Sequence, residues 1–86
     1  MSEEITGYEL SEKLLPAVEE QMESSETVFV KEHYERLLGE GEEEDEAKKL
    51  IALCLADEVE MMQKENRSFN LDRYEQMLQF LPIVPE

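Results

Sequence analysis

The fold is decided by residues 41–62, which read GEEEDEAKKLIALCLADEVEMM. The stretch opens with an unbroken run of acids at residues 42–46 and continues with apolar residues at helical spacing. At about 100° per residue, these apolar side chains gather on one side of a helix. They are Ala47, Leu50, Ile51, Cys54, Leu55 and Met62. The pattern predicts a long central helix over residues 44–64, with acids in its first turn that interact favourably with the helix dipole.

Glu58 falls near the middle of this apolar stripe, where a hydrophobic residue is expected. A buried carboxylate without a partner is destabilising, because it loses its hydration. We therefore expect a partner from another helix, and the candidates are His33, Arg36 and Arg73, with the hydroxyls of Tyr34 and Tyr74 as further donors. Three interpretations stay open: a buried polar pair that fixes the helix packing, a ligand-sensitive or proton-sensitive pocket, and a Glu58 exposed through a groove.

Upstream of the central helix, Gly39 and Gly41 predict the end of a helix over residues 26–38, because glycine tolerates the left-handed conformation that ends helices. Residues 28–30, Val-Phe-Val, are also compatible with a strand. No other segment offers a pairing partner, so we interpret them as helical. The apolar face of this helix consists of Val30, Tyr34, Leu37 and Leu38.

Further upstream, Pro16 interrupts an apolar pattern that has helical spacing. Proline fits the first turn of a helix but not its interior, so a helix is expected over residues 15–23. Residues 1–13 are expected to be irregular or to form a short helical piece, with Thr6 as a cap and Glu9 three residues later.

Downstream, Asn70 is a favourable first cap for a last helix, and Asp72 falls in its first turn. Phe69 precedes the cap and is placed to pack against Tyr74 or the stem of Arg73 as a hydrophobic staple. The expected apolar face consists of Leu71, Tyr74, Met77, Leu78 and Leu81. Pro82 and Pro85 end the helix.

The tail, residues 82–86, carries two apolar residues beyond this last helix, Ile83 and Val84. Either they fold back over the bundle or they form an exposed segment that contacts a partner. With its 86 residues, the chain is expected to form one all-α domain, a bundle of three to four helices. Its methionines at positions 22, 62 and 77 are expected to fill the core.

The formal net charge of -15 restricts the partners. It repels nucleic acid phosphates and anionic lipids, so we expect no direct binding to nucleic acid or to a membrane. The simplest interpretation is a solvated surface that keeps the protein soluble. A basic protein partner is also compatible with this charge.

Few residues of this sequence are candidates for catalysis or for binding a metal or cofactor. Cys54 lies within an apolar stripe, so its thiol is expected to be buried and inert. Residues 41–46 lack the spacing of a calcium loop, and the sequence contains no zinc spacing, phosphate loop or dinucleotide motif. We expect no catalytic residue, no metal and no cofactor. A single cysteine and a start without a signal-peptide pattern predict the cytoplasm.

Structural residues occur in a recognisable order along residues 14–82. They are Leu15-Pro16, Gln21, Tyr34-Glu35-Arg36-Leu37, Gly41, Ala47, Leu50-Ile51, Glu58, Phe69, Arg73-Tyr74 and Leu81-Pro82. This order resembles a small helical family of bacterial proteins of unknown function. The resemblance implies a compact helical fold and a bacterial or archaeal origin, and it implies no activity.

Three hypotheses about function follow. The leading one is a non-enzymatic protein–protein interaction or adaptor module, which includes self-association through Ile83, Val84 and the outer face of the central helix. The second is a ligand-responsive regulatory domain with a polar pocket around Glu58, His33 and Arg36. The third is an acidic mimic of nucleic acid that occupies a basic groove on another protein.

Overall fold

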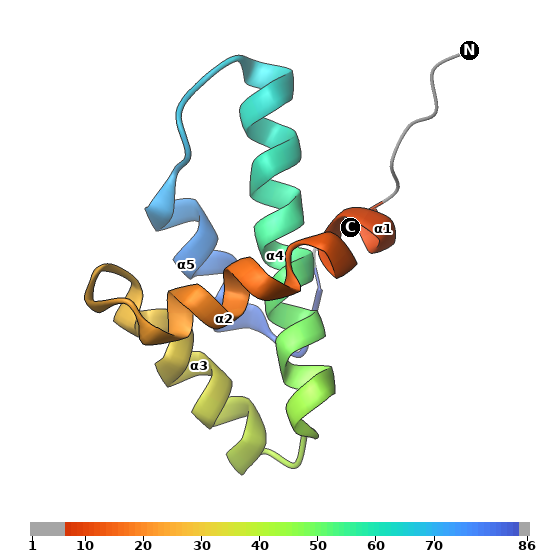
Figure 1. Ribbon diagram of the computed structural model, residues 1–86, viewed down its shortest axis with the longest axis vertical. Coiled ribbons are helices and arrows are strands. Elements are labelled where there is room, and N and C mark those ends of the chain that lie inside the picture. The colour runs from red at the N-terminus through yellow and green to blue at the C-terminus, as the bar shows by residue number, and fades with distance from the viewer. Residues whose placement is uncertain (1–6, 85–86) are drawn as a thin grey trace.

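A computed structural model describes residues 7–84 of the chain (Figure 1). Within that range the chain forms α-helices and one 3-10 turn, and it forms no strand. The elements are α1 (Gly7–Lys13), α2 (Leu15–Glu23), η1 (Ser25–Thr27), α3 (Val28–Gly39), α4 (Glu44–Glu65) and α5 (Leu71–Phe80). The all-helical prediction is confirmed, and residues 28–30 are helical rather than extended.

The longest helix, α4, holds the other helices together. It contacts α1, α2, α3 and α5. Figure 1 shows it as the long helix against which the shorter ones pack. The sequence predicted this central position, because apolar residues widen the stripe of α4 beyond the one face that an edge helix needs.

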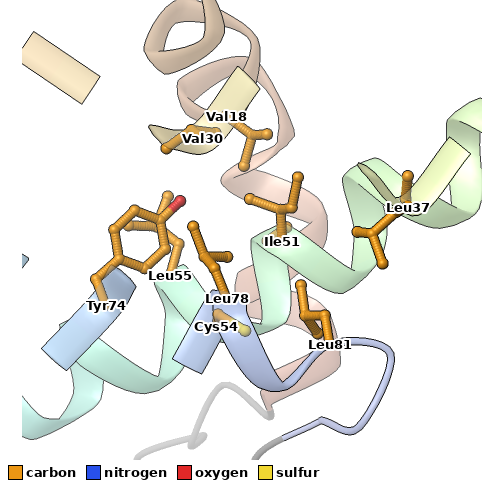
Figure 2. Packing of buried hydrophobic residues seen from close by; sticks show 11 residues of the cluster. Val18, Val30, Leu37, Ile51, Cys54, Leu55, Tyr74, Leu78 and Leu81 are labelled. Atoms are coloured by element: carbon orange, nitrogen blue, oxygen red, sulfur yellow. The ribbon is translucent and has the colours of Figure 1, made fainter. Parts of the chain in front are cut away.

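The core lies where α4 meets the other helices (Figure 2). Its buried side chains come from the helices α2 to α5 and from the residue after α5. They are Val18, Val30, Leu37, Ala47, Ile51, Ala52, Cys54, Leu55, Tyr74, Leu78 and Leu81. Phe29 and Phe69 pack edge-on against Tyr74, with ring centroids 5.8 and 5.6 Å away. Aromatic pairs of this geometry each contribute about 0.5–1.5 kcal/mol beyond the area that they bury.

Of the two alternatives for the N-terminal segment, the structure shows the short helical piece, because residues 7–13 form the helix α1. Leu14 joins α1 to α2 and still has helical dihedrals. The break arises at Pro16, which has no N–H for the carbonyl of Glu12 and whose ring would clash with it. One helical run is therefore divided in two. The predicted cap, Thr6, lies outside the described residues.

Gly41 and Asn66, which both have positive φ angles, follow the ends of α3 and α4. After α3, Gly41 adopts a φ of 102°, and the amide of Glu42 donates to the carbonyl of Leu37 at 3.0 Å. This pattern is a Schellman motif. After α4, Asn66 adopts the left-handed conformation, with φ 52° and ψ 52°. Both turns redirect the chain at once, so the next helix packs back on the bundle.

The start of α5 agrees with the prediction except at one residue. The side chain of Asn70 accepts from the amide of Arg73 at 3.0 Å, and Phe69 packs on Tyr74 as the predicted staple. Leu71, expected on the buried face, is 47% exposed. It lies in the first turn of α5 and borders an open hollow. Helical periodicity predicts on which face of a helix a residue lies. It does not predict whether a neighbouring element covers that end of the helix.

Candidate functional site

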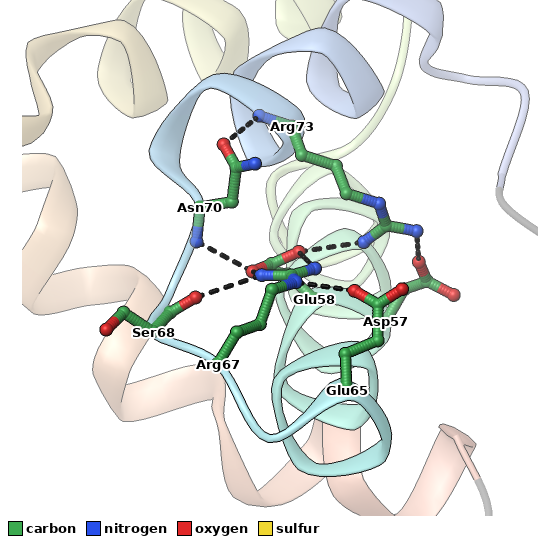
Figure 3. A network of polar contacts seen from close by, with 7 residues as sticks. All are labelled: Asp57, Glu58, Glu65, Arg67, Ser68, Asn70 and Arg73. Carbon is green, nitrogen blue, oxygen red and sulfur yellow. Dashed lines mark hydrogen bonds and ion pairs between the residues drawn. The ribbon is translucent and has the colours of Figure 1, made fainter.

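The carboxylate of Glu58 lies at the centre of a polar network between α4 and α5 (Figure 3). Its side chain is fully buried, with an exposed fraction of 0%. The guanidinium of Arg67 forms two hydrogen bonds to the carboxylate, with Nη1 2.6 Å from Oε2 and Nη2 3.1 Å from Oε1. This geometry is among the strongest that a carboxylate finds in proteins.

Two further donors complete the coordination of Glu58. The backbone amide of Asn70 donates to Oε2 at 2.7 Å, and Nη1 of Arg73 donates to Oε1 at 2.9 Å. Each carboxylate oxygen therefore accepts two hydrogen bonds, which matches the lone pairs that it offers. Among the described residues, no buried side-chain nitrogen or oxygen lacks a partner.

An outer layer of acids holds the two arginines in place. Nη2 of Arg73 donates to Oδ2 of Asp57 at 2.5 Å, and Nε of Arg67 donates to Oε1 of Glu65 at 2.5 Å. Arg67 also donates to the carbonyl of Ser68 at 2.9 Å. The network therefore ties the end of α4, the loop at residues 66–70 and the first turn of α5 into one unit.

The electrostatics keep Glu58 ionised at neutral pH. The hydrogen bond from Arg67 is the largest influence, and together with the amide of Asn70 and the side chain of Arg73 it outweighs burial. The pKa of Glu58 is lowered from 4.5 to about 2. The pKa of Arg67 is raised by its bond to Glu58, and that of Arg73 by its bond to Asp57. A carboxylate held in this state does not exchange protons near pH 7, so it does not suit general acid–base chemistry.

Of the residues that the sequence offered as partners, Arg73 contacts Glu58 but His33 and Arg36 do not. Arg36 lies at the other end of α5, where its guanidinium donates to the carbonyls of Leu78 at 2.9 Å and Leu81 at 3.1 Å. Its Nε donates to Nδ1 of His33 at 3.3 Å. The two bonds to carbonyls lie at the C-terminal end of α5, where a helix runs out of its own donors. The carbonyl of Leu78 also accepts from the amide of Leu81 at 3.2 Å.

The separation follows from the path of the chain. Only residues 40–43 join α3 to α4, so the C-terminal end of α3 lies beside the first turns of α4. Glu58 is about 21 Å farther along α4 than Glu44, at 1.5 Å per residue. The predicted pocket of Glu58, His33 and Arg36 is therefore corrected to two separate clusters, one at each end of α5.

The two candidate tyrosines also make their contacts away from Glu58. The hydroxyl of Tyr74 donates to Oε1 of Gln21 at 2.7 Å, which connects α5 to α2. The ring of Tyr34 lies 6.0 Å from the Nζ of Lys48. Burial raises the pKa of Tyr74, and burial together with the charge of Arg36 lowers the pKa of His33.

Three groups of the network were not predicted from the sequence: Arg67, Asp57 and the amide of Asn70. The predicted central helix ends at residue 64, and residues 66–68 were given no role. A signal was present, since Glu58 is within two turns of the end of α4, and a loop that returns over that end brings its own residues to the carboxylate. A basic residue in the loop was therefore a candidate partner.

A second feature is an exposed group of apolar side chains at the end of α5. Phe80 is 68% exposed, Ile83 73% and Val84 37%. Together with Met77 they line a hollow of about 200 Å³. We call these four residues the C-terminal apolar surface. It includes Ile83 and Val84, the two residues that the sequence offered as a partner surface.

Cys54 offers no reactive thiol. The side chain is fully buried, and burial raises its pKa to about 12. Between residues 7 and 84 no group of histidine, cysteine or acidic side chains is arranged to hold a metal ion. In the same range, no helix combines the length and the apolar character needed to cross a membrane.

The resemblance to a bacterial helical family stays a prediction. Comparisons with protein families, with curated proteins and with solved structures found no match to this chain.

Proposed function

We propose that this protein is a small, acidic, non-enzymatic protein–protein interaction module, and that it contacts its partner through the C-terminal apolar surface. The observation that carries the proposal is the exposure of Phe80 and Ile83, at 68% and 73%, side by side on one hollow. Adjacent exposed apolar side chains mark interaction sites more often than isolated ones do. Burying them against a partner is favourable by about 25 cal/mol for each Å² removed from water.

The backbone that presents this surface is well supported. Leu81, between Phe80 and the tail, is buried in the core. Arg36 holds the carbonyls of Leu78 and Leu81, and the amide of Ile83 donates to the carbonyl of Phe80 at 3.0 Å. A surface held in one shape loses little entropy on binding, which favours its use as a docking site.

The Glu58 network supports a structural role rather than a ligand site. Both oxygens of Glu58 are already paired with protein donors, so a ligand would have to displace them. We therefore assign the network to holding α5 in place. No described feature favours the hypothesis of a nucleic-acid mimic.

The proposed compartment is a reducing cytoplasm. One buried cysteine and no disulfide are compatible with it. The net charge of -15 supports a protein partner over nucleic acid or a membrane surface.

Affinity purification from the cells that naturally produce the protein tests the proposal. We expect the wild type to co-purify a defined partner, and Ile83→Ser to lose it. Leu71→Ser is the matched control, because Leu71 is an exposed apolar residue at the opposite end of α5. Loss of the partner in both variants, or in neither, contradicts the assignment to the C-terminal apolar surface.

A further inference from the structure

We infer that the partner contributes a basic amphipathic helix, which lies in a groove formed by the C-terminal apolar surface, α4 and α1. This inference rests on the proposed function and specifies the chemistry of the partner. It is carried by the shape of the apolar surface and by the charges at its edge.

The C-terminal apolar surface does not stop at the tail. A second hollow, of about 500 Å³, is lined by Leu50 and Leu53 from α4 and by Pro82 and Val84 from the tail. Ser11 and Glu12 of α1 also line it. Val84 borders both hollows, so they adjoin each other. The apolar path therefore leads from Leu50 past Val84 to Ile83.

An elongated apolar groove suits a helix better than a small molecule. Small-molecule pockets enclose most of the ligand, whereas Ile83 and Phe80 lie largely exposed at one end of this groove. A helix places anchors at positions i, i+3 or i+4, and i+7, and it lays them along such a groove. The two hollows offer room for successive anchors.

The edge of the groove selects the charge of the helix. Two acids and one base line the larger hollow, Glu12, Glu46 and Lys49, and Glu46 belongs to the acidic first turn of α4. The Nζ of Lys49 lies 3.9 Å from Oε1 of Glu46, and both side chains are 57% exposed. An exposed pair at this distance is worth little, so a cation of the partner can compete for Glu46.

The charge also disfavours a second copy of this chain as the occupant. Each copy carries a net charge of -15, so association brings like charges together. Lysine or arginine on the polar face of a partner helix has the opposite effect. The strength of this attraction decreases with salt, since the screening length is about 8 Å at physiological ionic strength.

Synthetic peptides test the inference directly. The probe is a peptide of about 18 residues, long enough for a marginal helix, with leucines at helical spacing and lysines elsewhere. One control has the same composition in scrambled order, and a second replaces the lysines with glutamates. We expect the ordered lysine peptide to bind at least about tenfold tighter than either control in fluorescence anisotropy at physiological salt. Equal binding of the scrambled peptide, or no binding of the ordered one, overturns the inference.

Variants locate the binding. Leu53→Ser and Ile83→Ser are expected to weaken the binding of the ordered peptide by about fivefold or more. Leu71→Ser is expected to leave its affinity unchanged. Glu46→Gln is expected to weaken binding at low salt and to reduce its salt dependence. Circular dichroism verifies that each variant remains helical. If Leu71→Ser lowers the affinity for the ordered peptide as much as Ile83→Ser does, the peptide does not bind in the groove.

Failure of this inference is distinguishable from failure of the proposed function. If a natural partner depends on Ile83 but no basic peptide binds, the interaction module stands and the basic helix is wrong. If the protein forms a dimer that Ile83→Ser abolishes, the occupant is a second copy. If no partner depends on Ile83 and no peptide binds, both proposals fall.

Discussion

At the scale of residues, Glu58 decides how α5 is attached to α4. Its place in the apolar stripe led to the expectation of a polar partner, and Arg73 is one of the partners found. Arg67 and the amide of Asn70 were not foreseen, because a helical pattern says nothing about the path of a loop. A backbone amide is present at every residue except proline, so its use at one position is visible only in the folded chain.

Replacing Glu58 tests its structural importance. Glu58→Ala removes the acceptor of Arg67, Arg73 and the amide of Asn70, so we expect a loss of about 2–4 kcal/mol in the free energy of unfolding, allowing for the partial exposure of both arginines. Glu60→Ala, on the same helix, is the control and is expected to lose less than about 1 kcal/mol. Urea denaturation measures both, and equal small losses would show that the network contributes little.

The low pKa of Glu58 predicts a dependence on pH. A carboxyl group whose pKa falls from 4.5 to about 2 on folding stabilises the folded state fully above pH 4.5, and this contribution disappears as the pH falls through about 2. Glu58→Gln lacks the titration while the other acids stay the same. The difference in unfolding free energy between wild type and Glu58→Gln should therefore shrink between these pH values. A constant difference across the range contradicts the lowered pKa.

At the scale of elements, caps and breakers defined most helix boundaries. The predicted ranges for α2 and α4 agree with the structure to within one residue, because Pro16 and Asn66 limit them. The helix α1 was harder to predict, since a short segment before a proline gains its stability from packing rather than from its own hydrogen bonds. In the structure α1 packs against α4, which the periodicity of residues 7–13 alone does not reveal.

Two glycines at the end of α3 should respond in opposite directions to alanine. Gly41 has a φ of 102°, so Gly41→Ala introduces backbone strain and is expected to destabilise by about 1 kcal/mol or more. Gly39 lies within α3, and an added Cβ meets no atom within 4 Å. Gly39→Ala is expected to stabilise by about 0.5–1 kcal/mol, because alanine favours the helix. Thermal unfolding of both variants checks this, and destabilisation of the same size in both would contradict the assigned turn.

At the scale of the whole molecule, the all-helical class and the central position of α4 followed from the sequence. The pairing of side chains between helices did not. His33 and Arg36 were expected near Glu58, yet the short link between α3 and α4 places them at the opposite end of α5. Such pairings depend on how far each residue lies along its helix, and helical periodicity contains no information on that distance.

The charge of the whole molecule predicts its association state. With a net charge of -15, the protein is expected to be monomeric across a range of concentrations in moderate salt. Light scattering measures the mass. A dimer that persists on dilution would show that contacts between copies overcome the repulsion, and its loss in Ile83→Ser would identify a second copy as the occupant of the groove.

Site-specific photo-crosslinking in living cells compares the two candidate sites most directly. A photoreactive residue replaces Ile83 in one protein and Ser68, an exposed residue beside the Glu58 network, in another. If the C-terminal apolar surface binds the partner, position 83 yields a discrete crosslinked product with another protein and position 68 yields none. A product at position 68 alone would contradict the assignment and return the Glu58 network to consideration as the functional site.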